Sequence, residues 1–122
     1  MVDIVAFRGF RPPVERVETV ASLPYDVIES DEARIIAQER PYSFYHISKP
    51  EVDLDPDIDL YDERVYAKGA ENLRRFVAET TFIQDPQPCF YVYKQSFEEN
   101  KEKGIKAHSQ VGIVAGASVA EY

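Results

Sequence analysis

The sequence predicts a mixed α/β domain with the element order strand, helix, strand, helix, strand, strand. Three observations indicate this fold class. Apolar residues recur at helical spacing in 31–40 and 60–79. Segments rich in β-branched and aromatic residues, which are typical of strands, fill 3–10, 43–48, 89–97 and 110–120. Clusters of proline and glycine separate the segments, so we expect one mixed sheet packed by two helices.

Each predicted helix has an expected start. Ser30 is placed to cap the first helix, which must end at Pro41. Asp59 is placed to cap the second. Gly69 within the second helix costs about 1 kcal/mol relative to alanine, so we expect a close neighbour there. Apolar residues at 4-3-4 spacing are expected to form the buried stripe of this helix: Tyr66, Ala70, Leu73 and Val77.

The last two predicted strands are joined by the polar connector EENKEKG, which suggests a hairpin. Cys89 opens the first of these strands, between a proline and an aromatic run, and is expected to be a small buried hydrophobic residue. It is the one cysteine of the chain, which excludes an internal disulfide and a cysteine metal cluster.

Composition bounds the size and the partners of the protein. A chain of 122 residues with 44% hydrophobic content suffices for one domain with a single core. The formal net charge of −8 argues against DNA or RNA as a partner but leaves a small-molecule ligand open. No apolar run could span a membrane and no signal-peptide pattern occurs, so we expect a cytoplasmic protein with no membrane partner. The oligomeric state is left open.

Familiar metal and nucleotide signatures are missing from the sequence. Alternating aspartates from Asp53 to Asp59 resemble the opening of a calcium loop, but Ile58 and Arg64 stand where an EF-hand needs glycine and glutamate. Neither glycine-rich phosphate cradle occurs. The two histidines have no third ligand at metal spacing. We therefore expect no metal site built by the chain itself.

The segment LPYDVI, residues 23–28, places a proline, a tyrosine and an aspartate ahead of the first helix. Pro24 fixes its own φ and favours an extended Leu23. Val27 and Ile28 are expected to enter the core, which would hold Asp26 stiffly. A stiff carboxylate suits a general base or a ligand of a metal-bound phosphate. It equally suits a turn aspartate bonded to its own backbone, and physical reasoning favours the turn.

Four further side chains have both a functional and a structural interpretation. Arg8 and Arg11 flank a glycine turn and could clamp a carboxylate or phosphate, or could pair with acids of the chain. His46, in the strand predicted at 43–48, is either a hydrogen-bonded core residue or a catalyst. His108 precedes the last strand in a polar segment, where a solvated histidine and a functional one are both plausible.

Three segments of the chain resemble one known family: LPYDVIESDEARIIAQERPYSFYHISKPEVD, NLRRFVAETTFIQDPQPCFYVYKQ and AHSQVGIVAGASVAEY. The family is named domain of unknown function 1015, and its members typically read S-P-P-Y-D-V-I, P-x-S-F, H-[VI] and [RK]-P-E. The resemblance covers almost the whole chain. Leu23 departs from the usual proline and could loosen the turn, while Val111 stands where threonine is frequent and removes a possible hydroxyl ligand.

Some members of that family are tied to phosphorylation of free serine by a nucleoside triphosphate or diphosphate. The resemblance therefore implies Mg²⁺ and ATP or ADP as cofactors. It implies a base or magnesium ligand at Asp26, a clamp at Arg8 and Arg11, and a further polar contact at His46 or His108. The positions expected in the site are catalytic Asp26 and His46, and ligand-binding Arg8, Arg11, Tyr25 and His108.

Family members are also several-fold longer than this chain. Residues 1–122 are accordingly expected to form a single α/β domain, the N-terminal fragment of a longer protein that ends here at Tyr122. The expected function is the N-terminal part of a small-molecule kinase. The alternative is a non-catalytic ligand-binding or interaction module in which LPYDVI is purely structural.

Overall fold

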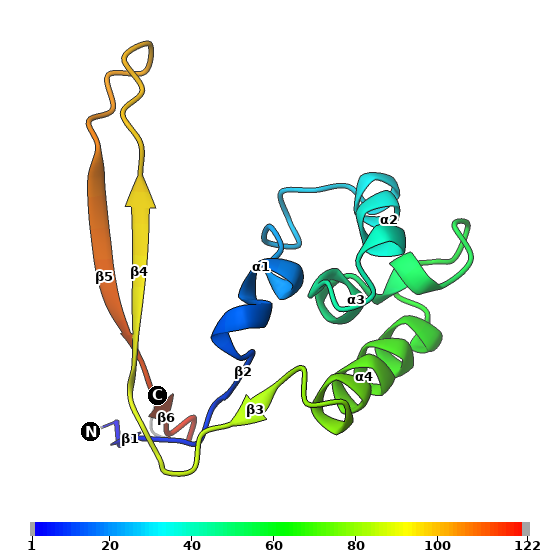
Figure 1. The fold of residues 1–122 in the computed structure, drawn as a ribbon, viewed down its shortest axis with the longest axis horizontal. Helices are drawn as coiled ribbons and strands as arrows, with labels where there is room; N and C mark the ends of the chain where they lie inside the picture. The colour runs from blue at the N-terminus through cyan, green and yellow to red at the C-terminus, as the bar shows by residue number, and fades with distance from the viewer. Residues whose placement is uncertain (1, 121–122) are drawn as a thin grey trace. The chain divides into compact units, whose positions relative to one another are not determined.

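The computed structural model describes residues 2–120, so Tyr122 lies outside the described residues. The chain divides into two compact units (Figure 1). Unit 1 contains the N-terminal segment up to Gly9 and the chain from Gln84 onward, and unit 2 is Phe10–Ile83. Unit 1 carries strands and unit 2 is largely helical, which confirms the mixed α and β class.

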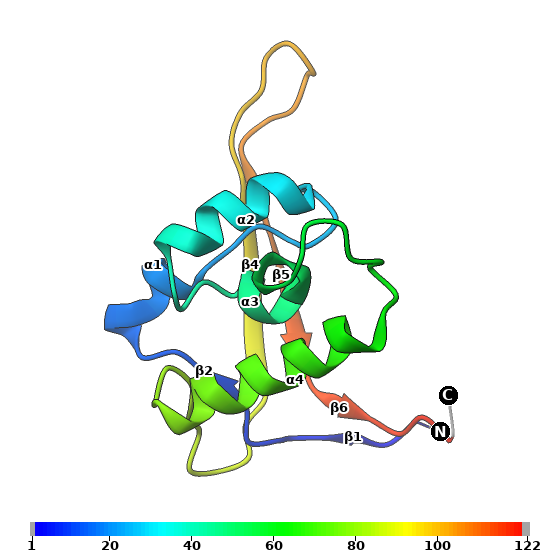
Figure 2. The same cartoon turned by 90° about the vertical axis from the view of Figure 1, so that its right-hand side faces the viewer.

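Unit 2 begins with strand β2 (Phe10–Arg11), which pairs with strand β3 (Ile83–Gln84), and it ends at Ile83, the first residue of β3. Between the two strands lie the helices, with these bounds: η1 Val14–Arg16, α1 Val17–Val20, α2 Ser30–Glu39, α3 Tyr45–Ser48, η2 Pro50–Asp53 and α4 Glu63–Ala78. The short α3 lies between α2 and α4 in both views of the fold (Figures 1 and 2). It therefore forms the centre of the unit.

Two clusters of buried side chains make the core of unit 2. One joins α2 to α3 and η2, and contains Ile28, Ala33, Ala37, Tyr45 and Val52. The other contains Val20, Phe76 and Phe82, with the rings of Phe76 and Phe82 packed edge to face at 5.5 Å. Of the two residues expected to enter the core after Asp26, Ile28 does so and Val27 is exposed. The buried residues of the described chain all belong to unit 2.

Unit 1 is built from two short antiparallel pairs. Strand β1 (Ile4–Val5) pairs with β6 (Gly116–Ala117). Strand β4 (Tyr91–Phe97) pairs with β5 (His108–Val114) from Tyr91 opposite Val114 to Phe97 opposite His108, which confirms the predicted hairpin. Cys89 lies just before the hairpin and is exposed, so its predicted burial is wrong. The proline before it and the bridge that its backbone makes to Phe7 keep it at the margin of the sheet.

Two expectations about the sheet are corrected. The described strands form three separate two-stranded sheets and not one mixed sheet. The strand predicted at 43–48 is the helix α3, which starts where the Ser43 hydroxyl accepts a hydrogen bond from the Tyr45 amide at 3.2 Å. Tyr45 and His46 are both buried, and consecutive side chains cannot both face a core from a strand that is covered on one side.

The helix starts also differ from expectation. Glu29 stands at the N-cap of α2, while the Ser30 hydroxyl donates to the Glu51 carboxylate at 2.8 Å. Asp62, and not Asp59, caps α4, where its side chain accepts from the Arg64 amide at 2.9 Å. Aspartates three residues apart satisfy the same capping preference, so sequence alone does not separate them.

The buried face of α4 is rotated by one residue from the predicted stripe. Val65, Asn72 and Phe76 are buried, whereas Tyr66, Leu73 and Val77 are exposed at 62%, 43% and 37%. The polar Asn72 occupies a core position that a hydrophobicity pattern cannot anticipate. Gly69 lies on the buried side, and a Cβ there would approach the Pro50 ring to 2.9 Å, which confirms the expected close neighbour. In the described chain, no helix has the length and apolar character needed to cross a membrane.

Candidate functional site

A cavity of about 530 Å³ opens in unit 2 between the segment Ile47–Glu51 and helix α4. Its volume falls within the range of typical small-molecule sites. Three exposed tyrosines line it, Tyr25, Tyr61 and Tyr66, at 65%, 84% and 62% exposure. Aromatic faces held at the mouth of a cavity are suited to stacking against a planar ligand.

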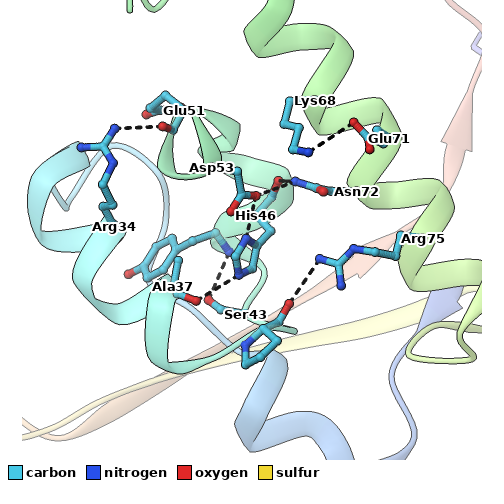
Figure 3. Close-up of polar contacts among 12 residues, drawn as sticks. Arg34, Ala37, Ser43, His46, Glu51, Asp53, Lys68, Glu71, Asn72 and Arg75 are labelled. Carbon is cyan, nitrogen blue, oxygen red and sulfur yellow. Dashed lines mark hydrogen bonds and ion pairs between the residues drawn. The ribbon is translucent and has the colours of Figure 1, made fainter. Parts of the chain in front are cut away.

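Lys49 and Glu51 are the charged residues of the cavity lining, and Lys49 supplies the positive charge. Its ammonium is buried, lies 3.4 Å from the Glu51 carboxylate and donates to the Tyr25 carbonyl at 3.3 Å. The Glu51 carboxylate also accepts from Ser30, and the Glu51 carbonyl accepts from Arg34 at 2.9 Å (Figure 3). These contacts tie the turn at Tyr25, helix α2 and η2 to one buried ion pair. A buried pair with several hydrogen bonds holds its members in a fixed place.

Two features shape the cavity beside Lys49. The absence of a side chain at Gly69 lets α4 approach Pro50 closely, and both residues line the cavity. Ser48 also lines it, and the Ser48 hydroxyl is buried with no hydrogen-bond partner within the described chain. Buried polar atoms are normally satisfied, so the unpartnered Ser48 hydroxyl is an exception next to the cavity.

A polar network next to this wall joins the buried side chains of His46 and Asn72 to the exposed Asp53. His46 Nδ1 lies 2.8 Å from Asp53 Oδ2, and Asn72 Nδ2 donates to Asp53 Oδ2 at 2.9 Å and to the His46 carbonyl at 2.7 Å (Figure 3). His46 Nε2 lies 3.0 Å from the Arg40 carbonyl and 3.2 Å from the Ala37 carbonyl. The network joins α2, α3, η2 and α4.

The network shifts the pKa values of its two ionisable members. Burial alone would lower the pKa of His46, but the hydrogen bond and charge of Asp53 and the two carbonyls outweigh it and raise the pKa above 6.5. Burial would raise the pKa of Asp53, yet its bonds to His46 and Asn72 and the charge of Lys68 leave the pKa below 3.8. Both groups are therefore stabilised in their charged forms.

Two of the predicted site residues lie at or beside the cavity mouth. Residues Tyr25 and Asp26 occupy a turn closed by a hydrogen bond from the Val27 amide to the Pro24 carbonyl at 3.2 Å. Tyr25 lines the cavity, as expected for a ligand contact. Asp26 follows it and is exposed, so its carboxylate is accessible to solvent and not locked against the core.

The other predicted residues are distributed over both units. His46 lies behind the cavity wall in unit 2, and Arg11 lies in β2 of the same unit. Arg8 and His108 belong to unit 1. Arg8 Nε donates to the Asp85 carbonyl at 2.8 Å, and the ring of His108 stacks on Phe97 with centroids 4.6 Å apart. The proposed clamp therefore has one arginine in each unit.

Sequence reasoning missed Lys49 and Glu51 as site residues. A signal was present, because both belong to the K-P-E triplet that follows the His-Ile pair. Asn72 was missed without a comparable signal, since a single polar residue in an amphipathic helix carries no motif. Among the described residues, no group of three or more histidine, cysteine, aspartate or glutamate side chains could hold a metal ion.

The comparisons with known proteins place this chain in a family. A model described as "Protein of unknown function (DUF1015)" matches residues 4–122. The chain belongs to this family. No curated protein and no solved structure matches it. Two of the segments on which the resemblance rests, that of Tyr25 and that of Lys49, Pro50 and Glu51, contribute residues to the cavity described above.

Proposed function

We propose that the cavity beside Lys49 binds a small molecule, and that the reaction it serves is phosphorylation of free serine by a nucleotide. The observation that carries the first part is the meeting of these two separated segments at one cavity, joined by the bond from Lys49 to the Tyr25 carbonyl. The tyrosine faces are suited to a nucleobase, and a lysine ammonium is a common partner of phosphate. The second part rests on the family resemblance.

In this reaction the terminal phosphoryl group moves from the nucleotide to the serine hydroxyl oxygen. That hydroxyl loses its proton to a base, and ADP leaves when the donor is ATP. Asp26, exposed beside the cavity-lining Tyr25, is the proposed base or the single carboxylate ligand of Mg²⁺. Mg²⁺ usually needs only one or two protein carboxylates in addition to substrate phosphates, so the carboxylate of Asp26 alone would suffice.

Charge supports a requirement for the magnesium complex. Glu51 neutralises Lys49 in the cavity wall, and the chain carries a net charge of −8. Free ATP would meet a repulsive field, whereas Mg²⁺ removes two of its negative charges. We propose the cytoplasm as the location of this reaction, because the cytoplasm supplies both ATP and Mg²⁺.

A non-catalytic ligand-binding module is the second candidate, and the His46 contacts favour it. Both ring nitrogens of His46 already face acceptors, so the ring is not free to accept a proton from a substrate. In this candidate the cavity binds a ligand without turnover.

Titration calorimetry of the full chain with ATP and ADP, with and without Mg²⁺ and serine, tests the proposal. Tyr66→Ala should weaken binding at least tenfold, while Tyr93→Ala in unit 1 should not, although the two tyrosines are equally exposed, at 62% and 60%. Asp26→Asn should abolish phosphoserine formation but leave the fold intact. If the unaltered protein binds nucleotide but forms no phosphoserine, the non-catalytic module is favoured. If the folded protein releases no heat of binding with any of these ligands, both candidates are overturned.

A further inference from the structure

The contacts of His46 specify its protonation state. The three atoms within hydrogen-bond distance of its ring nitrogens, Asp53 Oδ2 and the carbonyls of Arg40 and Ala37, are all acceptors. A neutral imidazole has one N–H, so one ring nitrogen would then face an oxygen with no proton between them. The doubly protonated ring donates on both sides and satisfies every contact.

This ring sits at one end of the cavity wall. His46 precedes and Asp53 follows the segment 47–52, which contributes Ser48, Lys49 and Glu51 to the cavity. The 2.8 Å bond between His46 and Asp53 therefore closes a loop whose residues form the wall. Asn72 on α4 bonds to both ends of that loop, through the His46 carbonyl and the Asp53 carboxylate. The wall is held against the helix on the opposite side of the cavity.

We propose that protonated His46 is a positioning residue for the part of the cavity wall formed by Ser48, Lys49 and Glu51. The affinity of the cavity for its ligand should therefore fall as the pH rises and the ring loses its second proton. The inference rests on the proposed function only for the identity of the ligand. Loss of the proton leaves a ring nitrogen without hydrogen facing an acceptor, either Asp53 or the carbonyls of Ala37 and Arg40, and the loop relaxes to separate them.

The groups around the ring make this titration simple. Asp53 of η2 is the one carboxylate of the described chain that contacts the ring. Helix α2 presents the carbonyl of Ala37, its C-cap residue Arg40 presents a second carbonyl, and α4 presents the uncharged Asn72. Lys68 of α4 acts on the network through Asp53. The raised pKa of His46 agrees with this geometry.

The test follows the wall and the affinity over the same pH range in the full chain. The imidazole signals of the two histidines are recorded by NMR and assigned with His108→Gln. Amide signals of 47–51 should titrate together with His46 in the absence of any ligand. Affinity for Mg²⁺–ATP should fall by about tenfold for each pH unit above the pKa of His46, because only the protonated form binds.

Asp53→Asn keeps an oxygen at the same place but removes the charge that holds the second proton. It should move both titrations to lower pH, whereas Asp57→Asn, an exposed aspartate of the same acidic loop, should move neither. The ionisation of the nucleotide affects the unaltered protein, Asp53→Asn and Asp57→Asn equally, so it cancels when their pH profiles of affinity are compared. A wall that titrates with His46 in a protein that binds no nucleotide would support the positioning role and overturn the proposed function alone. The inference would be overturned if the amide signals of 47–51 and the affinity for Mg²⁺–ATP did not change as His46 titrates.

Discussion

The two units of the chain differ in where their apolar side chains lie. Unit 2 encloses two core clusters and a satisfied polar network around His46. Unit 1 pairs its strands in register, yet Val92 and Ile113, opposite each other in the hairpin, are 75% and 76% exposed. A two-stranded hairpin has little stability of its own in water. Among the described residues, the side-chain packing that can hold a binding site in place is therefore found in unit 2.

The largest expected effect is a loss of stability from the core of unit 2. Phe76 is fully buried between Tyr42 and Phe82, and Phe76→Ala should lower the free energy of unfolding by about 3–5 kcal/mol. Val92→Ala, in the exposed hairpin, should change it by less than about 0.5 kcal/mol. Urea denaturation followed by circular dichroism measures both. Equal losses would remove the distinction between the units.

A second effect concerns pH. Because the pKa of His46 is raised in the folded state, this residue contributes to the free energy of unfolding. The contribution is fully present below pH 6.5 and is lost as the pH rises through the folded-state pKa, which lies above 6.5. The lowered pKa of Asp53 gives a contribution that is present above pH 3.8 and is lost as the pH falls through a folded-state pKa below 3.8. Stability from this pair is therefore greatest between these two values.

His46→Gln should remove the alkaline part of that profile and cost about 2 kcal/mol at pH 6, since it breaks a hydrogen bond to a charged group. Denaturant midpoints of the two proteins, measured from pH 5 to pH 9, should converge as the pH rises. Parallel curves across this range would show that His46 does not titrate within the fold, and would contradict the assignment of its charge.

A smaller effect on stability is expected at Gly69 in α4. Glycine to alanine in a helix normally stabilises by about 1 kcal/mol. Gly69→Ala should instead destabilise by about 1 kcal/mol, because its Cβ would lie 2.9 Å from the rigid Pro50 ring. The exposed Ala67→Gly is the control and should show the ordinary glycine cost. A stabilised Gly69→Ala would mean that α4 and Pro50 do not approach each other closely.

The smallest expected effect is at the start of α4. Asp62→Ala removes the observed cap and should cost about 1 kcal/mol. Asp59, the cap that the sequence predicts, accepts from the Tyr61 amide in the preceding turn, so Asp59→Ala should cost less. The same denaturation assay orders the two variants. The reverse order would place the start of the helix at the earlier aspartate.

The fold class, the hairpin and the two longer helices could be predicted because each depends on a local pattern. The helix α3 could not, because SFYHIS has the composition of a strand and its conformation is set by burial of Tyr45 and His46 against other elements. The buried face of α4 could not be predicted either, because it too is set by contacts with other elements. Asn72 is buried by its bonds to His46 and Asp53, which lie 26 and 19 residues away in sequence.

The site was predicted only in part. Tyr25 is at the cavity, and the turn at Asp26 followed from proline chemistry. Lys49 and Glu51 belong to the K-P-E triplet, but nothing in that triplet shows that the two side chains form an ion pair in a cavity wall. Arg8 and His108 lie in the other unit, a separation that spacing along the chain does not reveal.

An NMR titration of the ¹⁵N-labelled chain with Mg²⁺–ATP tests the cavity beside Lys49 as the nucleotide site. The shifted amides should cluster at the cavity, in the turn at Tyr25, the segment 48–51 and the first half of α4, and the hairpin β4–β5 should stay unchanged. Shifts centred on the hairpin, or none at saturating nucleotide, would contradict the assignment of the cavity beside Lys49 as the nucleotide site.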